Sequence, residues 1–344
     1  MSDLIDDFLQ SEERENAQEI ILEIKDEDIF EFKRLDQFLS KHLKDQSRSF
    51  IKALFDKGLI SYVEGFSHTK KLELKKIPPK GCKIQIIIPP PRPADAQPED
   101  IPLEIVYEDE HLVLINKPAG MVVHPAPGNY TGTLVNAILH HCKDIKGVGD
   151  QKRPGIVHRL DKGTSGVMVV AKDQKTHEGL VRLFSSHDIE RRYECLVMGV
   201  KIPSEGTLES TIGRHPQNRL KQACDVKGGK RALTHYKVLE YFNSFSHMQM
   251  TLETGRTHQI RVHLSELLKK PILCDPLYGN PKEHLNRLGN DYKAIIKDYP
   301  HPFLHARVLG FVHPITKEKI RYEVEPPELF QKVLNYAKSE LKDD

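Results

Sequence analysis

The chain has 344 residues, of which 38% are apolar and 29% are charged, a balance typical of a globular protein with material for two or three domains. No run approaches the roughly 18 apolar residues that a membrane span needs, and the acidic N-terminus resembles neither a secretory signal nor a basic transit peptide. The five scattered cysteines, with no CxxC pair, exclude a disulfide framework or a zinc knuckle and favour a cytoplasmic protein.

Charge divides the N-terminal part of the chain into two segments. Residues 1–31 hold 12 Asp and Glu against two Lys and Arg, a net charge of −10. Residues 32–88 hold 13 Lys and Arg against five Asp and Glu, a net charge of +8. A basic module behind an acidic extension is typical of an anion binder, nucleic acid first, although a solvated basic face is also common in small domains.

Two helices and two strands are predicted in this basic segment. Residues 34–44 place apolar side chains at helical spacing, and residues 47–58 repeat the pattern with Ser47 as N-cap and Gly58 as the closing residue. Residues 59–63 and 83–88 have the composition of strands.

The second predicted helix carries two basic residues on its exposed face. Arg48 and Lys52 lie one turn apart, where their mutual repulsion would be relieved by a bound polyanion. The whole segment is similar to the small RNA-binding module of ribosomal protein S-four, the alpha-L motif. That resemblance covers about 55 residues and implies that Arg48 and Lys52 contact RNA.

Residues 89–102 (PPPRPADAQPEDIP) read as a semi-rigid proline-rich linker between domains. Beyond it, residues 103–344 are expected to form one catalytic domain. The pattern predicts a hairpin at 104–116, a helix at 132–142, a buried strand at 165–172, a half-buried strand at 247–253 and a closing helix at 326–341. Because helices do not separate the strands regularly, we expect an α+β fold with a mixed, mostly antiparallel sheet, preceded by the small α/β RNA-binding module.

The absence of several common catalytic motifs reduces the number of reaction classes that the chain could catalyse. The sequence has no GxxxxGK[ST], GxGxxG, HExxH or GxSxG motif, so the usual signals of nucleotide hydrolysis, nicotinamide chemistry, zinc proteolysis and the serine-hydrolase elbow are missing. The histidine pairs lack a matching carboxylate cluster, and we expect neither a metal nor another cofactor.

Asp161 stands out in the segment 153–173. It is the only acid among Arg153, Arg159 and Lys162, ahead of a Gly-Thr-Ser-Gly turn. Nearby cations keep a carboxylate ionised, and an oriented carboxylate can serve as nucleophile or base without a metal. On its own, the tetrapeptide HRLD favours the simpler interpretation of an aspartate that caps its own turn.

Several rare motifs in order resemble the RluA family of pseudouridine synthases. They are KPAGMVVHP (117–125), HRLDKGTSG (158–166), RRYECLV (191–197), GRTHQIRVH (255–263) and LHARVLGFVHP (304–314). The resemblance spans about residues 103–325, and the leading alpha-L module makes the chain most similar to the RluD subgroup, which acts on large-subunit ribosomal RNA. The acidic residues 1–31 are not part of the pattern.

The resemblance implies roles for individual residues. Asp161 would be the catalytic aspartate, attacking the anomeric carbon or abstracting a sugar proton. Arg261 would pair with Asp161 through a bidentate fork, and Tyr193 would lie against the uracil. Arg159 would fill the space left by the flipped nucleotide.

Weaker candidates for contacts with the RNA backbone are Lys117, Lys162 and Arg256. We therefore expect a monomeric, cofactor-free isomerase whose partner is RNA, with a stem-loop of large-subunit (23S) ribosomal RNA as substrate. The alternatives are a synthase acting on another ribosomal site or on transfer RNA, a non-catalytic assembly factor, and an RNA hydrolase or glycosidase. The last of these would need a second carboxylate near the first.

Overall fold

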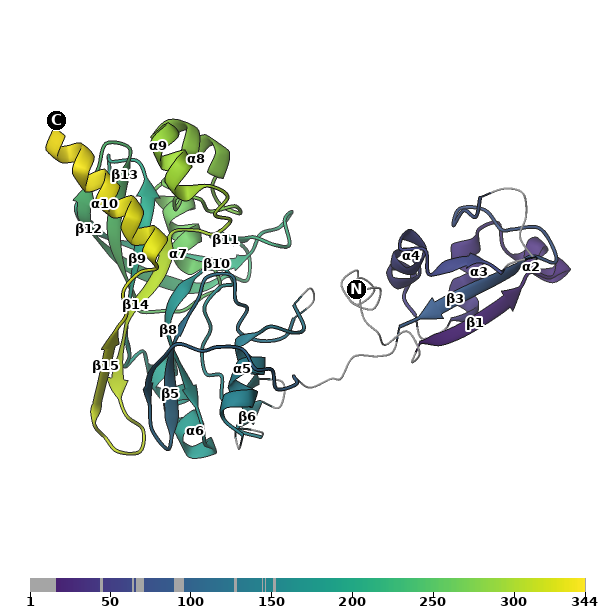
Figure 1. The fold of residues 1–344 in the computed structure, drawn as a ribbon, viewed down its shortest axis with the longest axis horizontal. Coiled ribbons are helices and arrows are strands. Elements are labelled where there is room, and N and C mark those ends of the chain that lie inside the picture. Colours follow the sequence, from purple (N-terminus) through teal and green to yellow (C-terminus); the bar gives the residue numbers. More distant parts are fainter. Residues whose placement is uncertain are drawn as a thin grey trace. The chain divides into compact units, whose positions relative to one another are not determined.

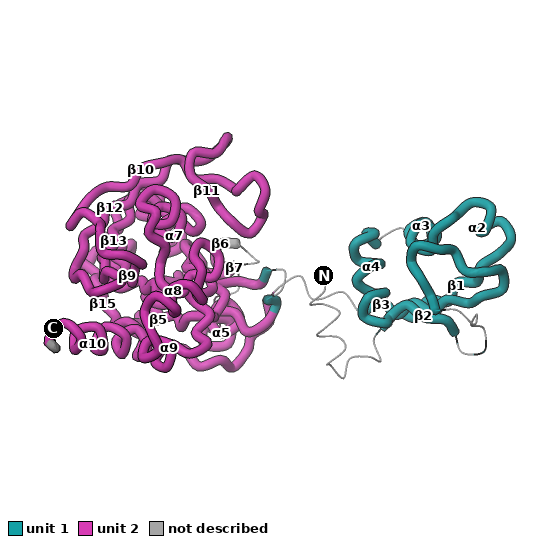
Figure 2. The backbone as a smooth tube through the Cα atoms, turned by 90° about the horizontal axis from the view of Figure 1, so that it is seen from above, with its two compact units in different colours: residues 1–94, 126–130 teal, residues 95–125, 131–344 magenta. Residues whose placement is uncertain are grey.

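The computed structural model describes residues 17–43, 46–63, 65, 71–89, 96–126, 129–143, 145, 147–150 and 153–343. The chain forms two compact units, one of residues 1–94 with 126–130 and one of residues 95–125 with 131–344 (Figures 1 and 2). Within the described residues, no helix combines the length and the apolar composition that a bilayer crossing requires.

The first unit is built on a three-stranded antiparallel sheet in the order β1-β3-β2. The strands are β1 (Gln18–Glu23), β2 (Ile60–Tyr62) and β3 (Lys83–Ile88). The buried side chains of β3 alternate with half-buried ones, because one face of the sheet packs on the helices and the other does not.

Three helices accompany this sheet: α2 (Asp26–Glu31), α3 (Leu35–His42) and α4 (Arg48–Asp56). The apolar stripes of α3 and α4 enter one core with the isoleucines of β3. The Ser47 side chain caps α4 by accepting a hydrogen bond from the Phe50 amide at 3.2 Å. Gly58, with φ of +75°, follows the helix end, as the sequence predicts.

The folded first unit includes part of the acidic N-terminal segment that the sequence analysis placed outside it. Strand β1 pairs with β3 along its whole length, from Gln18 opposite Ile88 to Glu23 opposite Lys83, and Ile24 is fully buried. The boundary expected at residue 32 is therefore corrected, since residues 18–31 belong to the folded unit; residues 1–16 lie outside the described part of the chain. The sequence analysis missed this strand because it divided the chain by net charge, and the acids of the strand face solvent.

The second unit holds a ten-stranded sheet in the order β11-β10-β12-β13-β9-β14-β8-β5-β4, with β15 paired to β14. Among the described strands, only the β14·β8 pair is parallel, which confirms the predicted mixed, mostly antiparallel α+β fold. The strands are β4 (Ile105–Glu108), β5 (Leu112–Lys117), β8 (Ser165–Ala171), β9 (Glu190–Met198), β10 (Glu205–Arg214), β11 (Gln222–Cys224), β12 (Lys230–Tyr241), β13 (Phe245–Leu252), β14 (Leu304–Val312) and β15 (Lys319–Glu323). A separate two-stranded ribbon joins β6 (Gly149–Asp150) and β7 (Arg153–Pro154).

Helices flank this sheet. They are α5 (Leu134–His141), α6 (Gln174–Ser186), α7 (Gln259–Val262), α8 (Pro281–Leu288), α9 (Asn290–Ile296) and α10 (Glu328–Asp343), with a π-helical turn at His263–Leu267. The predicted buried strand is confirmed, since every residue of β8 is buried. Strand β13 is more buried than its alternation suggests, because α10 covers the face on which Phe330 packs against His247.

The predicted linker is only partly a connection. Residues 90–95 lie outside the described part, whereas the amide of Glu99 donates to the carbonyl of Asn136 at 3.0 Å and the side chain of Asn136 donates to the carbonyl of Gln97 at 2.7 Å. The segment from residue 96 onward is therefore fastened to α5 as part of the second unit, which corrects the expected boundary at 103.

Candidate active site

Asp161 lies on a turn that leads into the buried strand β8. The amide of Thr164 donates to the Asp161 carbonyl at 3.0 Å, and the hydroxyl of Ser165 lies 2.9 Å from Nδ1 of His305 on β14. Gly166 has φ of +120°, and a Cβ there would lie 2.3 Å from the Ala306 carbonyl oxygen. Only glycine permits this approach, which fixes the aspartate turn against β14.

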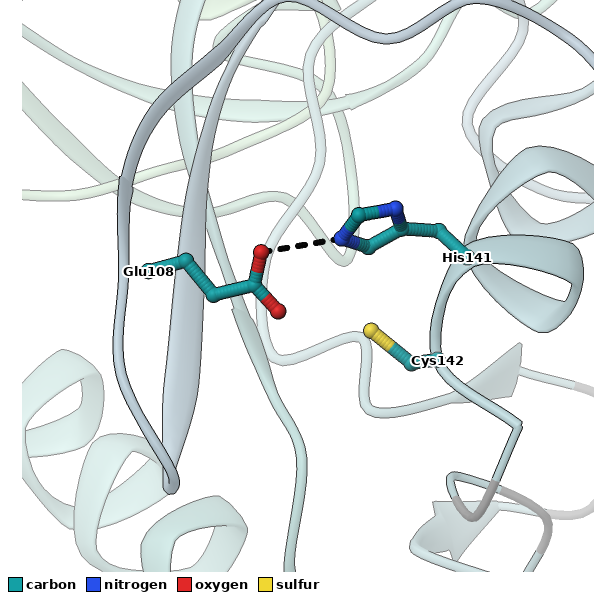
Figure 3. A group of neighbouring side chains, drawn as sticks. All are labelled: Glu108, His141 and Cys142. Atoms are coloured by element: carbon teal, nitrogen blue, oxygen red, sulfur yellow. Dashed lines mark hydrogen bonds and ion pairs between the residues drawn. The ribbon is translucent and has the colours of Figure 1, made fainter.

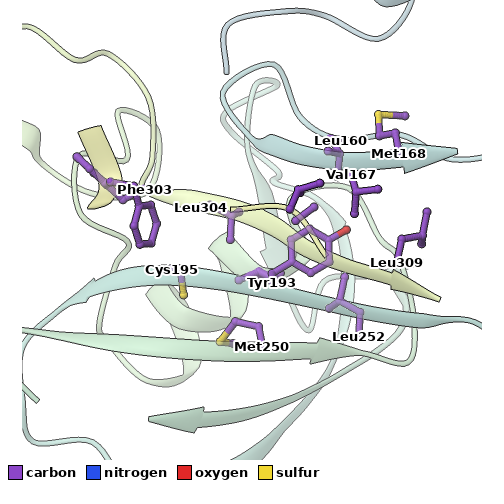
Figure 4. Close-up of a cluster of buried hydrophobic side chains, with 14 of the residues drawn as sticks. Leu160, Val167, Met168, Tyr193, Cys195, Met250, Leu252, Phe303, Leu304 and Leu309 are labelled. Atoms are coloured by element: carbon purple, nitrogen blue, oxygen red, sulfur yellow. The ribbon is translucent and has the colours of Figure 1, made fainter. Parts of the chain in front are cut away.

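Tyr193 extends from the centre of the same sheet. It lies on β9 opposite Met250 of β13 and Ala306 of β14. Its ring sits among apolar side chains that include Leu160, Val167 and Leu252 (Figure 4), and burial raises its pKa to about 12. The phenol is therefore neutral at physiological pH and presents an uncharged flat face to the pocket.

Arg261 lies between two carboxylates. Its NH1 group donates to Asp161 at 3.1 Å, whereas Nε and NH2 donate to the two oxygens of Asp275 at 2.8 and 2.9 Å. The predicted bidentate fork toward Asp161 is therefore corrected: Arg261 forms its fork with Asp275 and reaches Asp161 through one nitrogen. Asp275 is fully buried and also accepts from the amides of Leu277 and Tyr278 at 2.9 and 3.0 Å.

Electrostatics hold this cluster in its charged state. Burial by itself would lower the pKa of Arg261, but Asp275 and Asp161 more than offset it and the pKa is raised. Burial would likewise raise the pKa of Asp275, yet the guanidinium and the two amides lower it. The paired ions compensate each other's desolvation, as buried charges must.

His258 completes the surroundings of Asp161. Its Nε2 lies 3.8 Å from Asp161 Oδ2, and its Nδ1 lies 2.8 Å from the Tyr278 hydroxyl. Burial lowers the pKa of His258 although Asp161 opposes the shift, so the imidazole is neutral at pH 7. Neither Asp275 nor Tyr278 was identified from sequence, because CDPLYG carries no signal that separates a ligand of Arg261 from an ordinary turn.

These groups open onto a pocket of about 520 Å³. Its lining includes Asp161, Tyr193, Arg261 and His258 together with apolar side chains from β13, β14 and α6. Four arginines line it (Arg159, Arg191, Arg256 and Arg261), and Asp161 is the only carboxylate among its lining residues. A cavity with this charge balance and the flat ring of Tyr193 suits a planar base attached to an anionic backbone.

The other predicted contacts separate into two groups. Arg159 is exposed and Arg256 half-buried, and both line the pocket; the Nε of Arg256 donates to the Arg231 carbonyl at 3.0 Å. Lys162 is exposed but does not line it. Arg48 and Lys52 are exposed on α4 of the first unit.

Lys117 is not an RNA contact in this structure, which corrects that prediction. The side chain is fully buried, and its Nζ donates to the carbonyls of Pro118 and Met121 at 2.8 and 2.9 Å and reaches that of Lys162 at 3.5 Å. Lys117 therefore ties the Gly/Pro-rich loop to the residue after Asp161. A basic residue beside a loop reads as exposed from sequence, since sequence does not report burial.

One group among the described residues has the geometry to hold a metal ion. Glu108, His141 and Cys142 offer ligand atoms within 4.8 Å of one another (Figure 3). Both oxygens of Glu108 are already engaged at 2.9 Å, one by Lys172 Nζ and the other by His141 Nε2. The lysine cation opposes a second cation at this position, and none of the three residues lines the pocket around Asp161.

Comparison with known proteins identifies the family. Residues 111–266 match the model of the RNA pseudouridylate synthase family. The chain is 44% identical to the ribosomal large subunit pseudouridine synthase D of Zymomonas mobilis, over 87% of this chain and 92% of that protein. It is 42% identical to an uncharacterised RNA pseudouridine synthase of Aquifex aeolicus, over 91% of this chain and 98% of that protein.

A solved structure agrees with the sequence matches. Human RNA pseudouridylate synthase domain containing 4 is 28% identical, with a TM-score of 0.52, and the match covers 68% of this chain and 93% of that one. The chain therefore belongs to the RNA pseudouridine synthase family, and the predicted membership of the RluA type is confirmed. Enzymes of this family are isomerases, so the prediction of an enzyme is confirmed as well.

Proposed function

We propose that this chain isomerises uridines of large-subunit ribosomal RNA to pseudouridine, in the cytoplasm and as a monomer, with Asp161 as the reacting carboxylate. The observation that carries the proposal is the isolation of Asp161. It is the one carboxylate among the pocket's lining residues, its side chain is 17% exposed, and Arg261 holds it at 3.1 Å. A lone, aimed and accessible carboxylate suits reaction at a sugar.

The isomerisation needs little beyond this carboxylate. The bond between the ribose C1′ and N1 of uracil breaks, and a bond between C1′ and C5 forms; C5 loses a proton and N1 gains one, so atoms and electrons balance without a redox partner. Asp161 either attacks C1′ or removes a sugar proton, and both routes release uracil within the pocket. A second carboxylate, which hydrolysis of the glycosidic bond would use, is missing from the pocket's lining.

The surrounding side chains supply orientation rather than bond making. Arg261 aims Asp161 and is itself held by Asp275. Tyr193 offers the face on which the detached base turns, and its neutral phenol avoids repelling an electron-rich uracil. Arg159 at the pocket mouth occupies the position that the flipped nucleotide leaves in the RNA, because the base must leave its stack to reach Asp161.

Similarity supports the substrate. The Zymomonas mobilis relative, named for the ribosomal large subunit, matches over nearly its whole length. Single-stranded loops release bases more readily than helices do, so the target is expected in a stem-loop of 23S ribosomal RNA. The exposed basic residues Arg48 and Lys52 would add affinity through the phosphate backbone.

Mapping of pseudouridine in ribosomal and transfer RNA, with and without the gene, tests the substrate. Loss of pseudouridine at sites in large-subunit RNA is expected, whereas loss confined to transfer RNA would redirect the assignment. Complementation with Asp161→Asn tests the residue. The amide keeps the shape of the carboxylate but is a poor nucleophile and base, so the sites should stay unmodified while the purified variant still folds and binds RNA. Normal pseudouridine levels with this variant as the sole synthase would exclude Asp161.

A further inference from the structure

A second buried arginine borders the pocket, and the chemistry at Asp161 does not use it. Arg191 lies on β9 two residues before Tyr193, so both side chains extend from the same face of the strand. It is 7% exposed and lines the pocket. Arg191 and Arg261 are the two buried arginines among the described residues, and they differ in their partners.

Arg261 has two carboxylates, whereas no carboxylate of a described residue forms an ion pair with Arg191. Its NH2 group donates to the carbonyls of Leu252 and Glu253 at 3.3 and 2.6 Å, and the guanidinium lies 5.7 Å from the centre of the Phe184 ring. Nε is buried and has no acceptor among the described residues. A guanidinium has five N–H donors, and these contacts use only those of NH2.

A buried cation without a counter-charge is costly, and proteins rarely retain one without use. Burial lowers the pKa of Arg191, but an arginine stays protonated at neutral pH in any case. The positive charge therefore persists beside the pocket. The missing counter-charge is expected to arrive with the substrate.

The neighbouring loop lies close to this side chain. A Cβ at Gly255 would lie 2.9 Å from NH1 of Arg191, so a larger residue would press on the guanidinium. Gly255 opens the segment that carries Arg256, His258 and Arg261 to the pocket. Arg191 thus lies between the strand of Tyr193 and the loop of Arg261, at the junction of the two elements that would hold the nucleotide.

We propose that Arg191 binds the phosphate of the target nucleotide, next to the uridine whose base lies on Tyr193; this rests on the function proposed above. RNA carries one full negative charge per nucleotide, on phosphate, while its bases and ribose are neutral. A desolvated guanidinium with unused donors complements that group, since charge-assisted hydrogen bonds between arginine and phosphate are strong. The competing role is structural, in which Arg191 only fastens the end of β13 through its two carbonyl contacts.

Binding of mononucleotides separates these roles without knowledge of the RNA target. Uridine, uridine 5′-monophosphate and uridine 3′-monophosphate are titrated into the full-length protein and followed by NMR. One monophosphate should bind at least about tenfold more tightly than uridine, and this advantage should disappear in Arg191→Met. Arg191→Lys should keep part of it, because the charge remains. Equal binding of all three ligands, or an advantage that survives in Arg191→Met, would overturn the proposal.

An RNA version measures the same coupling in the complete substrate. Stem-loops around a uridine identified by mapping carry one methylphosphonate, which removes the charge, on the 5′ or the 3′ side of that uridine. The wild type should lose affinity for one of them, and Arg191→Met should bind this RNA and unmodified RNA equally well. If the methylphosphonate on either side lowered the affinity of Arg191→Met by the same factor as that of the wild type, the two effects would be independent and Arg191 would have a structural role.

Arg307→Met is the matched control. Arg307 is a half-buried arginine of β14 that does not line the pocket and pairs with Glu194, Glu323 and Glu325. Its removal should lower stability but preserve discrimination between phosphate and methylphosphonate. Wild-type protein that converts no uridine of the stem-loop would count against the proposed function, while the mononucleotide titrations would still decide the role of Arg191.

Discussion

The guanidinium of Arg261 shows how one side chain can serve two carboxylates unequally. Asp275 takes Nε and NH2 in a parallel pair of hydrogen bonds, and Asp161 takes NH1 alone. The buried pair with Asp275 fixes the plane of the guanidinium, and that plane directs NH1 at Asp161, the carboxylate proposed to react. Asp275 is thus a positioning residue, although it does not border the pocket.

Replacing Asp275 with Asn should therefore slow the reaction without touching the substrate. The amide can accept only one of the two hydrogen bonds, so Arg261 should rotate and Asp161 should move. Displacement of a reacting group by about 1 Å can reduce a rate on the order of 100-fold. Single-turnover rates should fall by about that factor with RNA affinity unchanged. Asp291→Asn, at a surface carboxylate bonded to Tyr336, is the control, and equal rates for wild type and Asp275→Asn would remove the positioning role.

Arg261→Lys tests the same arrangement from the other side. An ammonium keeps the charge but cannot form a planar fork with Asp275 while contacting Asp161. We expect turnover to fall by about 10- to 100-fold and the melting temperature to drop, since Asp275 is left buried with a poorer partner. Near-wild-type turnover of Arg261→Lys in single-turnover assays would mean that charge alone suffices.

Lys117 gives a prediction in pH. Burial lowers its pKa to about 7, against about 10.4 in an unfolded chain. Between these values the unfolded chain binds the extra proton, so this group destabilises the fold at pH 7 and the penalty fades as the pH rises toward 10, by about 3–5 kcal/mol in total. The free energy of unfolding of the wild type minus that of Lys117→Met should increase over this range. A flat difference would mean that the three carbonyls keep the ammonium charged.

Site residues could be predicted from the sequence where they lie within a recognisable motif. Asp161, Tyr193 and Arg261 lie within recognisable motifs and converge on one pocket. Asp275 and Arg191 escaped assignment because their importance depends on burial and on the partners they have or lack. Lys117 was misplaced for the same reason, since a lysine beside a Gly/Pro-rich loop is usually solvated.

At the scale of elements, the site depends on the pairing of β8 with β14. In the part of the chain that the structure describes, this is the only parallel pairing of the large sheet, with Ala306 opposite Gly166, and it brings the turn of Asp161 to the strand beside Tyr193. Strands β4, β5, β8 and β13 were predicted from their apolar runs and alternation, whereas the other six strands of the sheet were not. The order of the strands was not predictable, because β14 inserts between β8 and β9 from more than 100 residues away in sequence, and periodicity carries no information on such pairing.

Gly166→Ala should disrupt this pairing. The residue has a left-handed φ of +120°, and its new methyl would lie 2.3 Å from a backbone oxygen of Ala306. The combined strain and clash should lower the free energy of unfolding by about 3 kcal/mol or more. Gly132→Ala is the matched control, because Gly132 also has positive φ, of +66°, but has nothing within 4 Å; it should cost about 1 kcal/mol. Equal losses in urea unfolding would show that φ, and not contact with β14, requires glycine at 166.

At the scale of the whole molecule, charge is distributed differently from the sequence expectation. Because β1 and α2 belong to the first unit, its residues 17–88 carry 14 Lys and Arg against 11 Asp and Glu, a net charge of +3, instead of the +8 of the shorter segment. Two of the four acids of α2 pair with lysines of the same unit, Glu31 with Lys41 and Asp26 with Lys80. The basic residues of this unit that remain available to RNA therefore lie on other elements, of which α4 is the clearest candidate.

Neutralising α4 should weaken RNA binding without changing the chemistry. Arg48 is exposed, and Lys52 has only a long 3.9 Å contact with Asp56, so both are free to exchange counterions for phosphates. Each lost phosphate contact reduces the slope of log affinity against log salt by about 0.7–0.9, and Arg48→Ala with Lys52→Ala should reduce it by up to about 1.8. Lys41→Ala with Lys80→Ala is the control, because these lysines are already neutralised, and it should leave the slope unchanged. Turnover on saturating RNA should persist in both double variants, since neither removes a residue of the Asp161 pocket. An unchanged slope for the α4 variant would show that α4 does not contact RNA phosphates. A loss of turnover that saturating RNA does not restore would show that α4 contributes more than affinity.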